Sequence, residues 1–154
     1  MEIRPGGLDD GRVVALLRHH FAMCHAVTPV GSAHVFDVAR LKAPGVWFWS
    51  GWEGDQVVAV GALKQLADGH GEVKSMHTAE AARRMGYAAQ MLSHMIAEAC
   101  RLGMARLSLE TGSFEYFRPA VELYKAHGFV ECPPFEGYQP DPNSTFLTRE
   151  VSAS

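Results

Sequence analysis

The sequence lacks any long uninterrupted hydrophobic run, and no segment approaches the roughly 18 apolar residues that a membrane-spanning helix needs. Its opening stretch, MEIRPGGLDD, carries acidic side chains where a secretion signal has an apolar segment. These two absences argue against the common membrane and secreted classes of protein. We therefore expect a protein of the cytoplasm.

The sequence also has few cysteines and only a small net charge. The three cysteines, Cys24, Cys100 and Cys132, are odd in number and far apart, which argues against a disulfide framework and a paired metal knuckle. The histidines show no spacing with cysteines or carboxylates that is typical of a metal site. The net charge of −3 gives no broad basic surface for nucleic acid or an anionic membrane. We expect a small-molecule partner and no metal, nucleic acid or membrane.

Apolar residues make up 47% of the chain, enough for one buried core, and we expect residues 1–154 to form a single domain. Helix and strand patterns alternate along the chain, which is typical of the α/β and α+β classes. The predicted order is a strand, two helices, three strands, a helix, a strand, a helix and two strands. Helices are predicted over 12–21, after a cap at Asp9 or Asp10, over 34–41, from Ala79 to a stop at Gly103, and over 119–127. After the first, strands are predicted in VWFWSGW, VVAVGALKQL, GEVKSMHT, ARLSLET, FVECPPFEGY and STFLTREV.

Residues 72–92, EVKSMHTAEAARRMGYAAQML, change from a strand pattern to a helix pattern around two arginines and a glycine. The first turn of a helix has backbone N–H groups without partners and the positive end of the helix dipole, so it attracts anions. Gly86 and Ala88 are small enough for a phosphate to approach the backbone, and Arg83 and Arg84 add positive charge. The turn suits a pyrophosphate, although exposed arginines beside a packing glycine would give the same pattern.

The same turn resembles motif A of the GNAT superfamily of N-acetyltransferases, Gln/Arg-x-x-Gly-x-Gly/Ala, which Arg83, Gly86 and Ala88 match. Met85 stands where arginine, lysine or glycine is commoner in that motif. Residues 120–129, AVELYKAHGF, resemble the superfamily's Ala-x-x-Leu-Tyr-x-x-x-Gly-Phe segment. The segments HGEVKSMHT, LSLETGS and DPNSTF resemble a branch of small, single-domain bacterial acetyltransferases.

The resemblance implies a central, mixed, mostly antiparallel sheet of about seven strands, splayed between its fourth and fifth strands and flanked by about four helices. It also implies acetyl-coenzyme A (acetyl-CoA) as co-substrate. The pyrophosphate would lie on the backbone N–H groups of residues 84–88, and the pantetheine arm would fill the splayed gap as an extra strand. The side chain of Met76 can still belong to the core, because the expected contact uses backbone atoms. The cofactor-binding residues implied in this way are Met76, Thr78, Arg83, Arg84, Met85, Gly86, Tyr87 and Ala88.

The implied reaction is direct attack of an acceptor amine on the thioester in a ternary complex, without a cysteine nucleophile. It needs a base for the amine and an acid for the departing thiolate. Tyr124 matches the superfamily tyrosine proposed to protonate the sulfur; a core tyrosine with a satisfied hydroxyl is the alternative. Glu72 lies eleven residues before Arg83, the spacing of the catalytic glutamate in histone-type members. A salt bridge from Glu72 to Lys64 or Lys74 would be the structural alternative.

Glu110, on the neighbouring strand, is the second candidate base, and it can instead bind the ammonium group of the acceptor. Together with Glu72 and with Asp141, which lies in the loop of the predicted closing hairpin, Glu110 predicts an acidic entrance to the acceptor site. Such an entrance favours a small cationic amine. His77 alternates to the face opposite Glu72 and Met76, so we expect it at the surface or in a loop.

The predicted hairpin contains three tryptophans, Trp47, Trp49 and Trp52. They either line an acceptor pocket or form core or dimer contacts, which is the commoner role of aromatic residues in a hairpin. The sequence therefore leaves open whether the protein forms a homodimer. A non-catalytic sensor of acyl-CoA is the alternative to an N-acetyltransferase, and the sequence does not separate the two. A plain nucleotide-binding domain is disfavoured, because neither Gly-x-Gly-x-x-Gly nor Gly-Lys-Ser/Thr is present.

Overall fold

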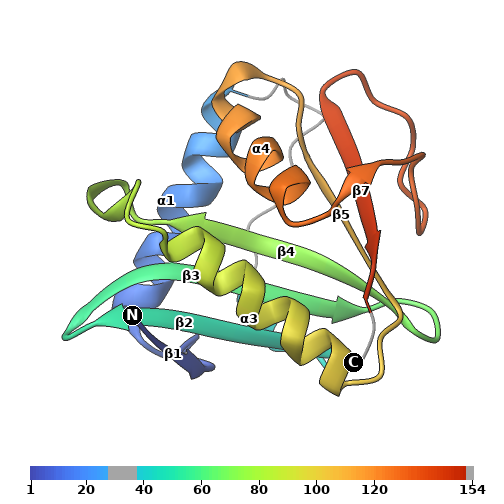
Figure 1. The fold of residues 1–154 in the computed structure, drawn as a ribbon. Helices are drawn as coiled ribbons and strands as arrows, with labels where there is room; N and C mark the ends of the chain where they lie inside the picture. Colours follow the sequence, from blue (N-terminus) through green and yellow to red (C-terminus); the bar gives the residue numbers. More distant parts are fainter. Residues whose placement is uncertain (28–37, 152–154) are drawn as a thin grey trace.

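The computed structural model describes residues 1–27 and 38–151 (Figure 1). Within them the elements follow the predicted order, with two short 3-10 turns at residues 80–82 and 115–117. The strands are β1 (Glu2–Pro5), β2 (Val46–Glu53), β3 (Gln56–Gln65), β4 (His70–Thr78), β5 (Arg106–Gly112), β6 (Val130–Glu131) and β7 (Ser144–Glu150). The helices are α1 (Gly11–Val27), α2 (Val38–Leu41), α3 (Tyr87–Arg101) and α4 (Arg118–Ala126). In this part of the chain, no helix has both the length and the apolar character needed to cross a membrane.

The described strands form a seven-stranded sheet in the order β1-β2-β3-β4-β5-β7-β6. Neighbouring strands are antiparallel except β4 and β5, which are parallel. The parallel pairing is short and ends where Glu72 lies opposite Ser108. Beyond that point β4 stays paired with β3 as far as Thr78, and β5 stays paired with β7 as far as Gly112. The predicted mixed sheet, splayed between its fourth and fifth strands, is therefore confirmed.

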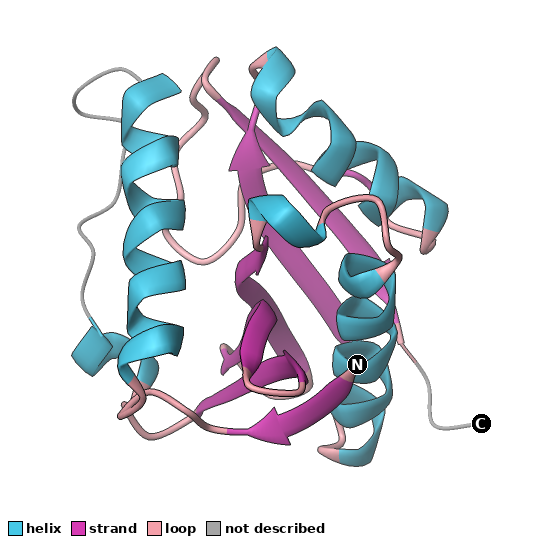
Figure 2. Ribbon diagram, turned by 90° about the vertical axis from the view of Figure 1, so that its left-hand side faces the viewer, coloured by secondary structure: helices cyan, strands magenta, loops and turns pink. Residues whose placement is uncertain are grey.

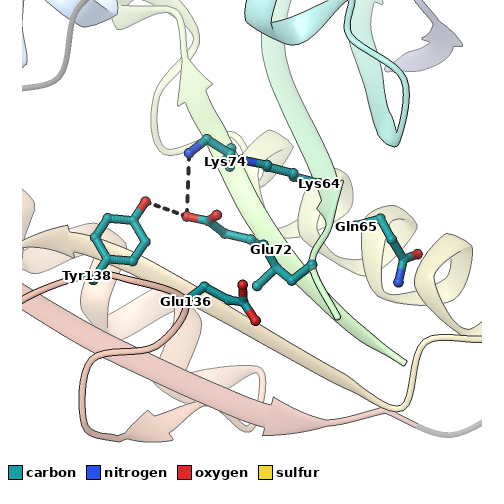
Figure 3. A pocket seen from close by; sticks show the side chains of 7 residues that line it. Lys64, Gln65, Glu72, Lys74, Glu136 and Tyr138 are labelled. Carbon is teal, nitrogen blue, oxygen red and sulfur yellow. Dashed lines mark hydrogen bonds and ion pairs between the residues drawn. The ribbon is translucent and has the colours of Figure 1, made fainter. Parts of the chain in front are cut away.

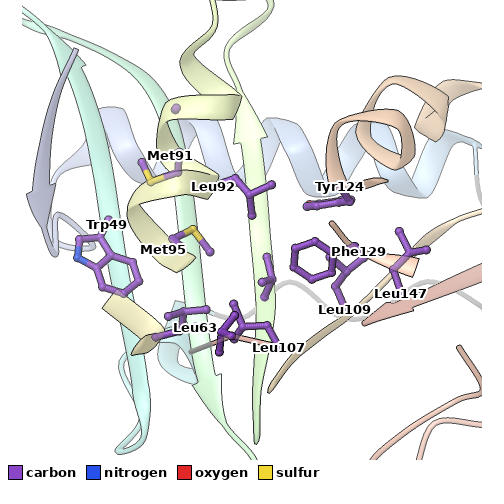
Figure 4. Close-up of a cluster of buried hydrophobic side chains, with 14 of the residues drawn as sticks. Trp49, Leu63, Met91, Leu92, Met95, Leu107, Leu109, Tyr124, Phe129 and Leu147 are labelled. Carbon is purple, nitrogen blue, oxygen red and sulfur yellow. The ribbon is translucent and has the colours of Figure 1, made fainter. Parts of the chain in front are cut away.

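Helices cover both faces of the sheet (Figure 2). Helices α3 and α4 pack on one face, where the α3-side core includes Leu63, Met91, Met95, Leu107 and Phe129 (Figure 4). Helices α1 and α2 pack on the other face, where the α1-side core includes Val13, Leu17, Leu41, Val60 and Ala62. These two layers bury most of the apolar residues whose spacing in the sequence predicts the helices and strands.

The tryptophans of the β2–β3 hairpin are core residues. Trp49 is 5% exposed and belongs to the α3-side core, while Trp52 is 4% exposed and belongs to the α1-side core. Trp47 packs against the α3-side core. Of the two roles predicted for these side chains, packing is the one the structure supports.

Helix α1 begins as predicted and ends later. Oδ1 of Asp10 accepts a hydrogen bond of 2.9 Å from the backbone N–H of Arg12, so Asp10 caps the first turn. The helix continues past the predicted end at Phe21 to Val27, because no glycine or proline interrupts the chain between them. Of the helix predicted over 34–41, α2 accounts for the last four residues, and the others lie outside the described part.

Helix α3 starts at Tyr87 rather than at Ala79. The alanine-rich stretch before it forms only a 3-10 turn, and Arg84 and Gly86 then adopt φ angles of 65° and 82°. A continuous right-handed helix cannot include such residues, so the chain turns before the helix begins. The predicted apolar stripe is buried at Met91, Leu92, Met95 and Ala99.

The closing hairpin forms, but its first strand is shorter than FVECPPFEGY suggests. Strand β6 covers only Val130 and Glu131, which pair with β7. Pro133 and Pro134 follow, and proline has no N–H to continue the ladder. The rest of the predicted strand becomes a loop, residues 132–143, which we call the β6–β7 loop.

Candidate active site

A cavity of about 810 Å³ lies where β4 and β5 separate. Its walls come from both halves of the sheet, from the first turn of α3, from α4 and from α1. A smaller cavity of about 280 Å³ adjoins it, and Glu72, Lys74 and Tyr138 line both. The splay of the sheet thus creates a space that reaches from a helix start to a buried carboxylate.

The first turn of α3 forms one end of the main cavity. Gly86 is the N-cap of the helix, and its φ of 82° is a conformation that side chains rarely adopt. The N–H of Gln90 donates to the carbonyl of Gly86, which leaves the N–H groups of residues 87–89 without partners inside the helix. A β-carbon on Gly86 would have no atom within 4 Å, so the space beside the turn is open. This end of the cavity can accept an anionic group.

The residues predicted to bind the cofactor at this turn mostly line the cavity. Arg83, Arg84, Gly86, Tyr87 and Ala88 do so, and both arginines are exposed. The ring of Tyr87 belongs to the α3-side core, so its backbone is the part left for a ligand. Met85 is not among the cavity-lining residues and its side chain is 59% exposed, which likewise leaves only a backbone contact.

A β-bulge at Ser75 changes the direction of the side chains along β4. Ser75 has a φ of 56°, and the pairing with β3 shifts between Lys74, opposite Ala62, and His77, opposite Val60. Ala62 and Val60 both belong to the α1-side core. Cross-strand partners share a face, so Lys74 and His77 lie on the same side of the sheet.

The prediction that His77 lies at the surface, on the face opposite Glu72, is therefore wrong. His77 is 8% exposed, and its ring centroid lies 4.4 Å from that of His20 on α1. Burial lowers the pKa of His77 to about 3 and that of His20 to about 4, with Arg83 adding to both shifts, so both rings are neutral at pH 7. Within the described part of the chain, Nε2 of His77 is buried without a hydrogen-bond partner. No motif points to His20, and simple alternation cannot reveal a bulge.

Met76 and Thr78 also line the main cavity. Met76 packs against the α3-side core, as the sequence allows. The N–H of Ala79 donates to Val58 of β3, and backbone groups of successive strand residues point to alternate sides. The backbone of Thr78 therefore faces the open side of β4, where an added strand could pair with it.

Tyr124 lies on α4, lines the main cavity and is 6% exposed. Its ring packs edge-on against Phe129 with a centroid distance of 5.7 Å (Figure 4). Burial raises the pKa of Tyr124 well above the ordinary value of 10, so the phenol stays protonated at neutral pH. The residue is thus a core side chain that also holds a proton at the cavity wall.

Glu72 is 4% exposed and has two polar partners (Figure 3). Its Oε2 accepts a hydrogen bond of 2.7 Å from the hydroxyl of Tyr138 and lies 3.5 Å from Nζ of Lys74. The salt bridge that the sequence offers as the alternative is therefore present, and it involves Lys74. It does not remove Glu72 from the cavity, whose wall the residue still forms.

The other predicted carboxylates differ in position. Glu110 on β5 lines the main cavity and accepts a hydrogen bond of 2.6 Å from the hydroxyl of Ser144. Asp141 accepts a hydrogen bond from the backbone N–H of Asn143 and is not among the cavity-lining residues. The structure thus brings Glu72 and Glu110 together on adjacent strands and leaves Asp141 in the turn beside them.

Cys24 on α1 lines the main cavity, but it is a poor nucleophile. Burial, together with the charge of Glu110, raises the pKa of its thiol to about 11, so little thiolate exists at neutral pH. Within residues 1–27 and 38–151, no group of three or more histidine, cysteine or acidic side chains is placed to hold a metal ion.

Comparison with known proteins agrees with this geometry. Residues 10–129 match the acetyltransferase (GNAT) family. The uncharacterized N-acetyltransferase YsnE of Bacillus subtilis is 44% identical over 98% of this chain and 100% of its own length. The uncharacterized N-acetyltransferase YedL of Escherichia coli is 43% identical over 95% and 92% of the two chains. The crystal structure of a putative acyl-CoA N-acyltransferase from Klebsiella pneumoniae superposes with a TM-score of 0.79 at 22% identity, covering 97% of each chain.

Proposed function

Because the chain belongs to the acetyltransferase (GNAT) family, whose members are acyl-CoA-dependent acyltransferases, we propose that it transfers the acetyl group of acetyl-CoA directly to the amine of a small-molecule or amino-acid-like acceptor. One observation carries this proposal. A single cavity connects the first turn of α3, the gap between β4 and β5, and the carboxylates Glu72 and Glu110. The cavity therefore offers a phosphate site, a channel for a thioester arm and an acidic end for an amine.

The proposed cofactor site is formed mainly by backbone groups. The pyrophosphate binds the N–H groups of residues 84–88, and Arg83 and Arg84 add positive charge beside it. The pantetheine arm lies along Met76 and Thr78 as an additional strand. Open space beside Gly86 and the unpaired edge of β4 support this placement.

The chemistry requires one proton acceptor and one proton donor. Glu72 takes a proton from the acceptor ammonium, and the amine nitrogen then attacks the thioester carbonyl carbon. When the C–S bond breaks, Tyr124 gives its proton to the departing thiolate, and the second proton that the nitrogen loses on forming the amide restores the Tyr124 phenol. The raised pKa of Tyr124 keeps that proton available, and the raised pKa of Cys24 supports direct transfer rather than an acyl-cysteine.

The acceptor is a small cationic amine. Lys74 partly balances the charge of Glu72, so Glu110 is the carboxylate that binds the ammonium group. Asp141 adds negative charge from the turn that also holds Ser144, the hydrogen-bond partner of Glu110. The neutral rings of His20 and His77 complete this region without repelling a cation.

The test is calorimetric titration of coenzyme A into Gly86→Val and a matched variant, Gly103→Val. Gly86 and Gly103 lie at the two ends of α3 and have φ angles of 82° and 83°. A β-carbon added to either glycine would have no atom within 4 Å. Both substitutions introduce similar backbone strain, of about 1–2 kcal/mol. Only the valine at position 86 occupies the space proposed for the pyrophosphate.

We expect both variants to lose similar thermal stability, whereas only Gly86→Val loses coenzyme A binding, by at least about tenfold in Kd. Equal binding by wild type and Gly86→Val would place the cofactor elsewhere. Absence of binding by the wild-type protein would remove the proposed function altogether.

A further inference from the structure

We propose that Tyr138 is a positioning residue that keeps the Glu72 carboxylate oriented to take the acceptor's proton. The proposal rests on the proposed role of Glu72 as the base. Tyr138 lies on the β6–β7 loop and lines both cavities beside Glu72.

The two oxygens of Glu72 have different surroundings (Figure 3). The hydroxyl of Tyr138 and the ammonium of Lys74 both contact Oε2, at 2.7 Å and 3.5 Å. Among the described residues, no hydrogen bond is made to Oε1. The carboxylate is thus held through one oxygen, while the other is left to accept a proton.

The β6–β7 loop holds the phenol in place by aromatic packing. The ring of Tyr138 lies 5.2 Å from that of Phe135 and 5.7 Å from that of Phe146, measured between centroids. Phe146 is on β7, in the half of the sheet beyond the splay, whereas Glu72 is on β4. The hydrogen bond therefore connects the two halves of the sheet at Glu72, the last residue of β4 that pairs with β5.

This hydrogen bond fixes the orientation of the Glu72 carboxylate. Burial raises the pKa of Tyr138, and the neighbouring Glu72 raises it further, so the phenol remains a donor across the working pH range. Replacing Tyr138 by phenylalanine removes the donor and keeps the ring, so the carboxylate should lose its fixed orientation while the aromatic packing is kept.

The experiment compares kcat and KM at pH 7 for the wild type, Tyr138→Phe and Gln139→Ala, with one cationic amine as acceptor. A misaligned base slows the chemical step without weakening the binding of either substrate. For Tyr138→Phe we expect kcat to fall about tenfold, while the KM for the amine stays close to that of the wild type. Gln139 is the exposed neighbour in the same loop, and its replacement should leave both constants unchanged.

Two further measurements separate positioning from a loss of structure. The KM for acetyl-CoA and the thermal midpoint of Tyr138→Phe should stay close to those of the wild type. In a Glu72→Gln background, Tyr138→Phe should cause no further loss, because its effect acts through that carboxylate.

The outcomes also distinguish this proposal from the one on which it rests. If Glu72→Gln abolishes turnover but Tyr138→Phe leaves kcat unchanged, Tyr138 has no positioning role and Glu72 remains the base. If Glu72→Gln turns over normally, Glu72 is not the base and both assignments are wrong. Additive losses in the double variant would also contradict the positioning role.

Discussion

Tyr124 combines two properties that usually conflict in one residue. It is 6% exposed and packed on Phe129, so it contributes to the core, yet it lines the cavity. Burial of the phenol raises its pKa, which ensures that the hydroxyl carries a proton when a thiolate needs one. The same burial restricts the motion of the side chain, as the proposed role of Tyr124 as a proton donor requires.

Tyr124→Phe tests this role because it removes one hydroxyl and little volume. We expect kcat to fall tenfold or more, on the order of general-acid contributions, while acetyl-CoA affinity and thermal stability stay close to wild type. Steady-state kinetics and calorimetry provide the measurement. An unchanged kcat would make Tyr124 a packing residue only.

The place and role of an individual residue can be predicted from the sequence where they depend on the spacing of residues within one segment. Gly86 is predicted to leave room for a phosphate beside the backbone, and the structure gives it a left-handed φ and open space at the first turn of α3. The predicted place of His77 is wrong, since the bulge at Ser75 reverses the alternation after it. The partner of Glu72 in the β6–β7 loop is not predictable, because Tyr138 is 66 positions away and only the folded chain brings them together.

At the scale of elements, the contact between α1 and β4 has a consequence for stability. His20 on α1 and His77 on β4 have folded-state pKa values of about 4 and about 3, against an ordinary value of 6.5. Between these values the unfolded chain binds protons that the folded chain does not. Stability from this contact is therefore complete above pH 6.5 and is lost as pH falls towards 4.

We expect urea denaturation to show that the wild type is less stable at pH 4.5 than at pH 7, with roughly 5 kcal/mol of the difference due to this pair. His77→Phe keeps a ring and removes one titrating group, so its stability should depend less on pH. His19→Asn changes a half-exposed neighbour whose charge adds to both pKa shifts, so it should weaken the pH dependence less than His77→Phe does. The same pH dependence in His77→Phe and the wild type would contradict this origin.

Element boundaries are predictable only where a local signal determines them. Asp10 caps α1 as predicted, because its side chain accepts a hydrogen bond from the first turn. The strand predicted through Pro133 and Pro134 instead stops at Glu131, since proline has no N–H to continue the ladder. The start of α3 is predicted too early because alanines favour a helix, whereas the left-handed residues Arg84 and Gly86 determine where the chain turns.

At the scale of the whole molecule, the central feature is the sheet that separates into two halves after Glu72. The order of elements is predictable, because alternating patterns and motif A specify it. The cavity is inferred only through the family resemblance, since no local pattern shows that two strands diverge. A ligand that lies between β4 and β5 would complete the sheet and place its reactive end beside Glu72, Glu110 and Tyr124.

The most direct test of this arrangement is thiol release from acetyl-CoA across a panel of amines, amino acids and carboxylates, with mass spectrometry of the products. We predict that thiol release depends on the amine, matches formation of its N-acetyl product, and is fastest with small cationic amines. Tight binding of acetyl-CoA with no acetylated amine from any member of the panel, or acetylation confined to acceptors without a free amine, would contradict it.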